Sequence, residues 1–167
     1  MRKTGKPILF VDVDGVISLF GFAADARPEG SFHTVDGIPH LLSARAGEYL
    51  RALAPHFELV WCTGWEDKAN EYLPHLLQLP GPLPFLTFDP PMGSRSAHWK
   101  LVAVTVFAGD RPVAWVDDAF NDECHAWAAD REAPTLLLRT DPPVGLTDEL
   151  VAELVGWASG LNGSTPL

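Results

Sequence analysis

Two pairs of acidic residues follow apolar segments of the chain, and together they could hold a cation. Asp12 and Asp14 close the run PILFVDVDG, and Asp117 and Asp118 follow the apolar residues 113–116. If these carboxylates converge in a poorly solvated cleft, their mutual repulsion costs several kcal/mol unless a cation lies between them. Mg²⁺ is the expected ion, because it prefers carboxylate and carbonyl oxygens and leaves coordination positions for a phosphate oxygen.

Other polar residues could bind the anionic substrate of such a site. Thr63 and Gly64 follow the apolar residues 57–62, and Lys100 lies near the start of another apolar segment. The Thr63 hydroxyl and the Lys100 ammonium are suitable donors for phosphate oxygens.

These side chains meet only if the segments that carry them are neighbouring parallel strands. Strand-like segments alternate with amphipathic helical patterns, which predicts an α/β fold with a doubly wound parallel sheet and helices on both faces. The strands are expected at residues 8–13, 57–62, 84–88, 113–116 and 135–138, and the helices at 41–53, 66–77, 97–107, 122–129 and 147–160. The helix at 97–107 is apolar all round, so we expect it to be well covered. Ligands bind such sheets at the carboxyl ends of the strands, which is where the polar residues lie.

A long segment, residues 16–39, separates the first strand from the first helix. Such connections are usually about 2–6 residues long, so the insertion predicts additional structure. Asp36-Gly37, between apolar residues, is typical of a hairpin turn. We expect a short flap over the carboxyl edge of the sheet, within a single domain of residues 1–160 that precedes a flexible tail at 161–167. The alternative is a disordered surface loop, for which residues 23–30 are a candidate.

Four motifs in this order make the chain similar to the haloacid dehalogenase (HAD) superfamily of phosphatases. The motifs are DVDGV at Asp12, CTG at Thr63, Lys100, and VDD at Asp117 and Asp118. Each motif alone is weak, but four in the right order, each at a predicted strand end or helix start, are specific. The resemblance covers nearly the whole chain. It implies a compact, Rossmann-like domain that hydrolyses phosphomonoesters with Mg²⁺ through an aspartyl-phosphate.

The resemblance also implies a role for each acidic residue of the first motif. Asp12 would be the nucleophile that attacks phosphorus and carries the phosphoryl group. Asp14 would be the general acid for the leaving oxygen and later the base for the hydrolytic water, and its backbone carbonyl would bind the metal. Gly15 makes it easy for the chain to leave strand geometry at this point.

The later motifs would complete the site. By the same resemblance, the Thr63 hydroxyl and the Gly64 N–H would hold phosphoryl oxygens, and Lys100 would neutralise charge on the nucleophile and the phosphate. We favour Asp118 as the direct Mg²⁺ ligand. Asp117 would then orient Lys100 or a metal-bound water.

Some residues have both a functional and a structural interpretation. Trp65 could stack on a substrate ring or close the pocket, or it could be a core residue, and His33 on the expected flap could contact substrate. Asp122 could join the outer shell of the metal or only begin a helix. Thr63 could also be an ordinary turn residue, and Lys100 a solvated helix residue.

Composition restricts the partners of the protein. The formal net charge of -10, from 22 acidic and 12 basic residues, opposes broad nonspecific binding to nucleic acid or anionic lipid, but it does not exclude a local site for an anion. Cys62 and Cys124 lack the spacing of a metal or disulfide motif and predict reduced thiols in a cytoplasmic protein. Because Asp12 and Asp14 interrupt the N-terminal apolar run, we expect a buried strand there rather than a signal peptide or a membrane segment.

Two non-enzymatic alternatives compete with the phosphatase. A receiver domain of a signalling protein also uses acidic residues, Thr and Lys, but here Thr63 and Lys100 precede the second acidic pair, which opposes that order. The other is a degenerate phosphate-binding protein on the same fold. The insertion at 16–39 is too short for a separate cap domain, so we expect an open cleft. Its substrate would be a small phosphomonoester, a nucleotide or RNA or DNA end, or a phosphoprotein, and another copy in a homo-oligomer could cover the site.

Overall fold

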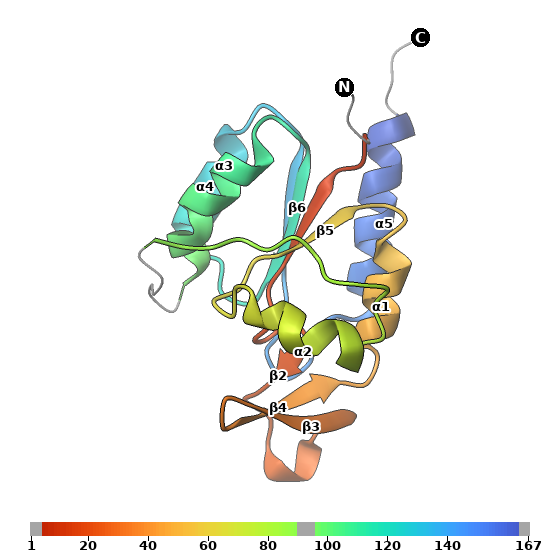
Figure 1. Cartoon of the computed structure of the whole chain (residues 1–167). Helices are drawn as coiled ribbons and strands as arrows, with labels where there is room; N and C mark the ends of the chain where they lie inside the picture. Colours follow the sequence, from red (N-terminus) through yellow and green to blue (C-terminus); the bar gives the residue numbers. More distant parts are fainter. Residues whose placement is uncertain (1–4, 90–95, 164–167) are drawn as a thin grey trace.

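A parallel four-stranded sheet forms the centre of the protein (Figure 1). The computed structural model describes residues 5–89 and 96–163. The strands are β1 (Ile8–Val11), β5 (Glu58–Trp61), β6 (Val113–Asp117) and β7 (Thr135–Arg139). They lie in the order β5-β1-β6-β7, and every neighbouring pair is parallel. Because β1 is central, the residues that follow it lie between the ends of β5 and β6.

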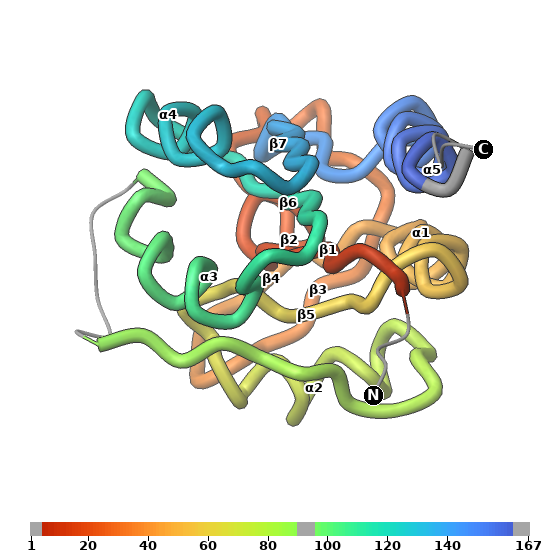
Figure 2. The backbone as a smooth tube through the Cα atoms, turned by 90° about the horizontal axis from the view of Figure 1, so that it is seen from above, coloured from red at the N-terminus to blue at the C-terminus, as the bar shows by residue number. Residues whose placement is uncertain are grey.

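Helices cover both faces of this sheet, as Figure 2 shows. They are α1 (Ala46–Leu53), α2 (Lys68–Leu76), α3 (Leu101–Ala108), α4 (Asp122–Asp130) and α5 (Asp148–Gly163). Alternate residues of β1 point to opposite faces. Leu9 and Val11 therefore pack in one core with residues of α1, α2 and α5, whereas Ile8 and Phe10 pack in another with residues of α3 and α4. The predicted α/β fold is confirmed.

A second, antiparallel sheet lies beyond the carboxyl ends of the central strands (Figure 1). It contains β2 (Ser18–Leu19), β3 (Gly30–Val35) and β4 (Ile38–Ser43) in the order β2-β4-β3. A short 3-10 turn, η1 (Ala24–Ala26), lies between β2 and β3. The expected flap was residues 16–39, but β4 continues to Ser43, so we refer to residues 16–43 as the flap.

The tip of the flap is the predicted hairpin turn. Asp36 and Gly37 have φ angles of 53° and 81°, the left-handed conformations that a two-residue hairpin turn requires. The Lys68 ammonium at the start of α2 contacts the Asp36 carboxylate, which attaches this tip to the main domain.

The first helix begins later than the sequence pattern predicted. Residues 41–43 belong to β4, and α1 begins at Ala46. Leu41 and Leu42 are both buried, so their apolar character fits a helix as well as a strand. Pairing of their backbone with both β2 and β3 decides in favour of the strand.

One expected strand and the expected end of the last helix were also wrong. The strand expected at 84–88 is reduced to a single bridge between Trp61 and Phe85, in a stretch where prolines at 80, 82 and 84 cannot donate to a ladder. Helix α5 begins as predicted, with the Thr147 hydroxyl accepting from the Leu150 N–H. It continues to Gly163, so residues 161–163 are helical rather than part of a tail, and residues 164–167 lie outside the described residues.

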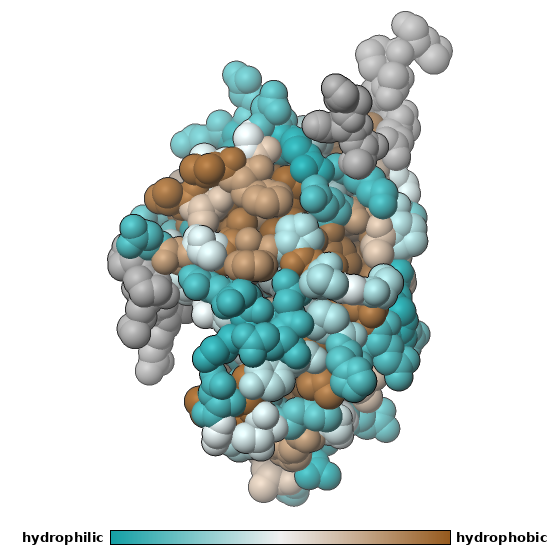
Figure 3. All heavy atoms as spheres, in the orientation of Figure 1, coloured by the Kyte–Doolittle hydropathy of each residue, from teal (hydrophilic) through white to brown (hydrophobic). Residues whose placement is uncertain are grey.

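The helix expected at 97–107 is not covered on all sides. It consists of a 3-10 turn, η2 (Ala97–Lys100), followed by α3. Val102 and Val106 on α3 are 77% and 78% exposed, and hydrophobic atoms are visible on this part of the surface in Figure 3. Apolar composition alone does not ensure burial. Within residues 5–89 and 96–163, every helix is too short or too polar to traverse a lipid bilayer.

Candidate active site

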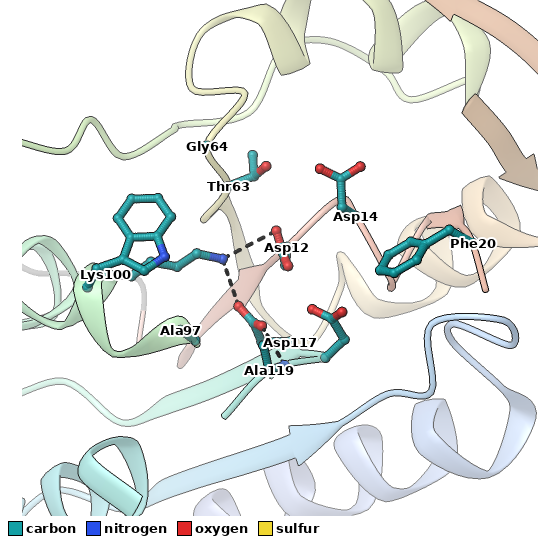
Figure 4. A pocket seen from close by; sticks show the side chains of 11 residues that line it. Asp12, Asp14, Phe20, Thr63, Gly64, Ala97, Lys100, Asp117 and Ala119 are labelled. Atoms are coloured by element: carbon teal, nitrogen blue, oxygen red, sulfur yellow. Dashed lines mark hydrogen bonds and ion pairs between the residues drawn. The ribbon is translucent and has the colours of Figure 1, made fainter. Parts of the chain in front are cut away.

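The chain turns sharply after β1 and brings two acidic side chains to one cavity. The Val13 carbonyl accepts hydrogen bonds from the backbone N–H groups of residues 16–18. Gly15 has a φ angle of +83°, a conformation that glycine adopts without steric cost. Asp12 and Asp14 consequently both line a cavity of about 670 Å³ at the carboxyl ends of the central strands (Figure 4).

Gly15 is required for a second reason, the close approach of Asp118. A Cβ atom on residue 15 would lie 2.5 Å from the Cγ of Asp118, so any side chain there would displace the acidic group. The buried hydroxyl of Thr140 donates to the Gly15 carbonyl at 2.7 Å and holds the turn in place. The loop after β1 and the loop after β6 therefore fit together only with glycine at this position.

Lys100 lies between two buried carboxylates. Its Nζ is 2.7 Å from Oδ2 of Asp117 and 3.3 Å from Oδ1 of Asp12, and it donates to the Cys62 carbonyl at 3.0 Å. Burial would lower the pKa of Lys100, but the Asp12 and Asp117 carboxylates outweigh it and raise that pKa, so the ammonium stays charged. The pKa of Asp12 is raised well above its usual value, first by burial, against the opposing effect of Lys100.

The two neighbouring acids after β6 have different surroundings. Asp117 is buried and uses both oxygens, since Oδ2 accepts from Lys100 and Oδ1 accepts from the Ala119 N–H at 3.0 Å. Asp118 is half-buried, and burial together with the nearby Asp117 raises its pKa to about 6. Asp12, Asp117 and Asp118 each place a carboxylate oxygen within 4.8 Å of the others. One ammonium faces three clustered acids, so the described residues leave excess negative charge here.

Thr63 and Gly64 close the side of the cavity next to β5. Thr63 is buried, and its Oγ1 accepts from the Trp65 backbone N–H at 3.2 Å, which leaves the hydroxyl proton available to a ligand. Gly64 has no side chain between its backbone and the cavity, and both residues line it beside Asp12 and Lys100.

Asp14 is contacted from the flap and from the loop after β5. Its Oδ2 accepts from Nε1 of Trp65 at 3.1 Å, and its Oδ1 lies 3.7 Å from Nδ1 of His40. The rings of His40 and Trp65 meet edge to face, with centroids 4.9 Å apart. Trp65 lines a second cavity, which shares Asp14 and Gly64 with the first, rather than the first cavity itself.

Comparison with known proteins identifies the family. Over residues 8–151 the sequence matches the family described as the HAD domain in Swiss Army Knife RNA repair proteins. The chain belongs to this HAD family. The matched range includes all four motifs, so the resemblance to the HAD superfamily is confirmed. The match also identifies the chain as a HAD-type hydrolase.

The other comparisons add little to this HAD assignment. No curated protein matches the chain. Among solved structures, a hypothetical protein from Xanthomonas campestris is similar over 95% of this chain and 86% of its own, with 17% sequence identity and a TM-score of 0.46.

Not every residue singled out in the sequence lies at the centre of the HAD site. His33 bonds to the Ser31 hydroxyl and lines a separate cavity with residues of α1 and α2, not the one that contains Asp12. Asp122 begins α4, whose N-cap is Asn121, and lies outside the cavity lining.

Three residues near the HAD site were missed by sequence reasoning. Phe20 and Trp99 line the cavity, and His40 lies beside Asp14. Trp99 directly precedes Lys100 and could have been suspected from that position. Phe20 and His40 carried no usable signal, because their positions depend on how the flap strands pair.

Proposed function

We propose that this HAD domain hydrolyses phosphomonoesters with Mg²⁺ and that Asp12 carries the phosphoryl group between the two steps. The observation that supports it best is the placement of Lys100 between Asp12 and Asp117, with Asp118 beside them and Thr63 across the cavity. This arrangement combines a nucleophile with a fixed positive charge and a hydroxyl donor, as phosphoryl transfer requires.

The donor set suits a Mg²⁺ ion. Oxygens of Asp12, Asp117 and Asp118 lie within 4.8 Å of one another. This is close to the separation of about 4.2 Å between two ligand oxygens on opposite sides of an octahedral Mg²⁺. Since Asp117 is occupied by Lys100 and the Ala119 N–H, we assign the direct carboxylate contacts to Asp12 and Asp118. We also assign the backbone carbonyl of Asp14, by the family resemblance. When bound, Mg²⁺ would offset charge on the phosphoryl oxygens.

In the first step a carboxylate oxygen of Asp12 attacks phosphorus. The Val13 N–H, at 2.8 Å, and Lys100, at 3.3 Å, both contact Oδ1 and hold the carboxylate in place. The bond between phosphorus and the leaving oxygen breaks, and that oxygen takes a proton from the Asp14 carboxyl group. Lys100, the Thr63 hydroxyl and the Gly64 N–H would hold the phosphoryl oxygens.

In the second step water releases the phosphate. The Asp14 carboxylate, which has just lost its proton, accepts a proton from a water molecule that attacks phosphorus. The bond between phosphorus and Asp12 breaks, inorganic phosphate leaves, and Asp14 is again protonated. Each step is a displacement at phosphorus that needs no oxidant or reductant.

The test is hydrolysis of p-nitrophenyl phosphate in the presence of Mg²⁺ and of EDTA. We expect activity with Mg²⁺, loss of at least about 100-fold with EDTA, because one charge-stabilising group is removed, and recovery when excess Mg²⁺ is added back. Release of phosphate at the same rate in EDTA and in Mg²⁺ would contradict the proposal.

A nucleotide or an RNA end is the second candidate substrate. The family's description refers to RNA repair proteins, and two aromatic residues, Phe20 and Trp99, line the cavity. Unpaired bases stack on such rings. In the same assay, nucleoside monophosphates and a phosphorylated RNA end would then be hydrolysed with a higher kcat/KM than glycerol phosphate. Equal values would favour a small phosphomonoester without a base.

Metal binding is also expected to appear in thermal stability. At a Mg²⁺ concentration about 100 times its Kd, the unfolding free energy would rise by about 2.7 kcal/mol, or roughly 5–10 °C in Tm. Because the pKa of Asp118 is about 6 in the folded protein, protons compete with the ion below that pH. The rise in Tm should therefore be larger at pH 7.5 than at pH 5.

Without metal, Asp118 makes the stability of the protein depend on pH in the opposite direction. A carboxyl group whose pKa is raised by folding binds more protons in the folded state, so stability falls as pH rises from about 4 through 6. Asp118→Asn should keep or raise the metal-free Tm and lose the rise with Mg²⁺. Asp122→Asn is the control, and it should behave like the wild type. A full rise with Mg²⁺ in Asp118→Asn would show that Asp118 is not a ligand.

A further inference from the structure

The flap approaches the Asp14 carboxylate through His40, whose Nδ1 lies 3.7 Å from Oδ1 of Asp14. Asp14 lies in the turn that contains Gly15, and its side chain is 50% exposed. A carboxylate in that setting can rotate unless neighbouring groups restrain it. The inference below rests on the proposed function, in which Asp14 transfers the proton.

His40 lies on one side of the carboxylate. It comes from β4 of the flap, and its side chain is only 16% exposed, although its position lies beyond the main sheet. Nδ1 lies 2.9 Å from the Ser18 hydroxyl and 3.7 Å from Oδ1 of Asp14. Ser18 also accepts the Gly15 N–H through its backbone carbonyl at 2.7 Å, so strand β2 links His40 to the catalytic turn.

Trp65 contacts the other side of the carboxylate. Its Nε1–H donates to Oδ2 of Asp14 at 3.1 Å, while its ring packs edge to face against His40. An indole N–H can only donate, so Oδ2 is the acceptor. The proton that Asp14 gives to the leaving oxygen is then best placed on Oδ1.

We propose that His40 and Trp65 are positioning residues that hold the Asp14 carboxyl group in the orientation needed to protonate the leaving oxygen. The flap thereby belongs to the proton-transfer machinery, and the role follows from three contacts that come from β2, β4 and the loop after β5. The effect should depend on the leaving group, because a weakly basic phenolate departs without a proton and an alkoxide does not.

The experiment combines kinetics with an NMR signal that does not depend on activity. In the 167-residue chain with Mg²⁺, kcat/KM is measured for p-nitrophenyl phosphate and for glycerol phosphate, since this ratio covers the steps up to departure of the leaving group. We expect His40→Gln and Trp65→Phe to lower kcat/KM for glycerol phosphate at least about tenfold and to change it less than about threefold for p-nitrophenyl phosphate. His33→Gln is the matched control, because His33 lies opposite His40 in the same hairpin, and both values should stay at wild-type level.

The NMR signal is that of the indole N–H of Trp65. The chain has six tryptophans, and the signal of Trp65 is the one that disappears in Trp65→Phe. It should shift in Asp14→Ala and in His40→Gln and stay in place in His33→Gln. An unmoved signal in Asp14→Ala means that the hydrogen bond is absent and overturns the inference at any level of activity. Equal losses of kcat/KM on both esters, or no loss on either, also overturn it. A wild-type protein that hydrolyses neither ester would instead overturn the proposed function, and the positioning role with it.

Discussion

Asp12→Asn is expected to lower phosphomonoesterase activity by at least about 1,000-fold, with no loss of thermal stability. Asparagine keeps the size of the side chain but cannot carry a phosphoryl group in this way. The substitution removes one of the clustered, buried carboxylates whose pKa is raised by burial, so the metal-free Tm should stay the same or rise. Activity is measured with p-nitrophenyl phosphate and Mg²⁺, and Tm by circular dichroism.

The matched control is Asp25→Asn, in the exposed turn η1 of the flap, which should retain wild-type activity. Rapid quenching should trap a phosphoryl group on the wild-type protein and none on Asp12→Asn. This result would show that Asp12 carries the phosphoryl group. Activity that survives both EDTA and Asp12→Asn would eliminate the proposed chemistry altogether.

Lys100→Met is expected to reduce both activity and stability. The side chains of Lys100 and Asp117 are 5% and 1% exposed, so methionine would leave the carboxylates of Asp117 and Asp12 without their shared cation. Breaking a buried ion pair in this way costs about 3–5 kcal/mol. For a protein of this size the Tm should fall by roughly 6–20 °C. The loss of a group that stabilises phosphoryl charge should lower kcat by about 100-fold or more.

A second substitution separates the two effects of Lys100→Met. Lys100→Met combined with Asp117→Asn removes one of the unpaired charges and should recover part of the Tm but none of the activity. Lys68→Met, at the exposed ion pair with Asp36, is the control and should cost less than about 1 kcal/mol. A wild-type Tm in Lys100→Met would show that this lysine does not balance the buried carboxylates.

The centre of the site was predictable from the sequence because its residues stand at the ends of strands. Apolar runs that end in Asp12, Thr63 and Asp117 identify parallel strands, and the topology of such sheets brings their carboxyl ends together. The expected contact between Lys100 and Asp117 is present at 2.7 Å. No comparable rule predicted that a side chain at position 15 would clash with Asp118, because the two residues are far apart in the sequence.

The flap was predictable only in part. Asp36-Gly37 indicated the hairpin, because few residue pairs tolerate two left-handed conformations in succession. The approach of His40 to Asp14 depends on the pairing of β4 with β2, and a strand as short as β2 does not specify its pairing strongly. This explains why His33 was singled out in place of His40, its direct partner across the hairpin.

The central position of β1 has a consequence for how the protein is made. Ile8 pairs with Glu58 on one side and with Val113 on the other, so the strand that leads to Asp12 leaves the ribosome long before its second neighbour exists. Until β6 is synthesised, one edge of this apolar strand is open to other chains. The pairing of β6 with β1 therefore completes the surroundings of Asp12 and, in the same folding event, protects the nascent chain from aggregation.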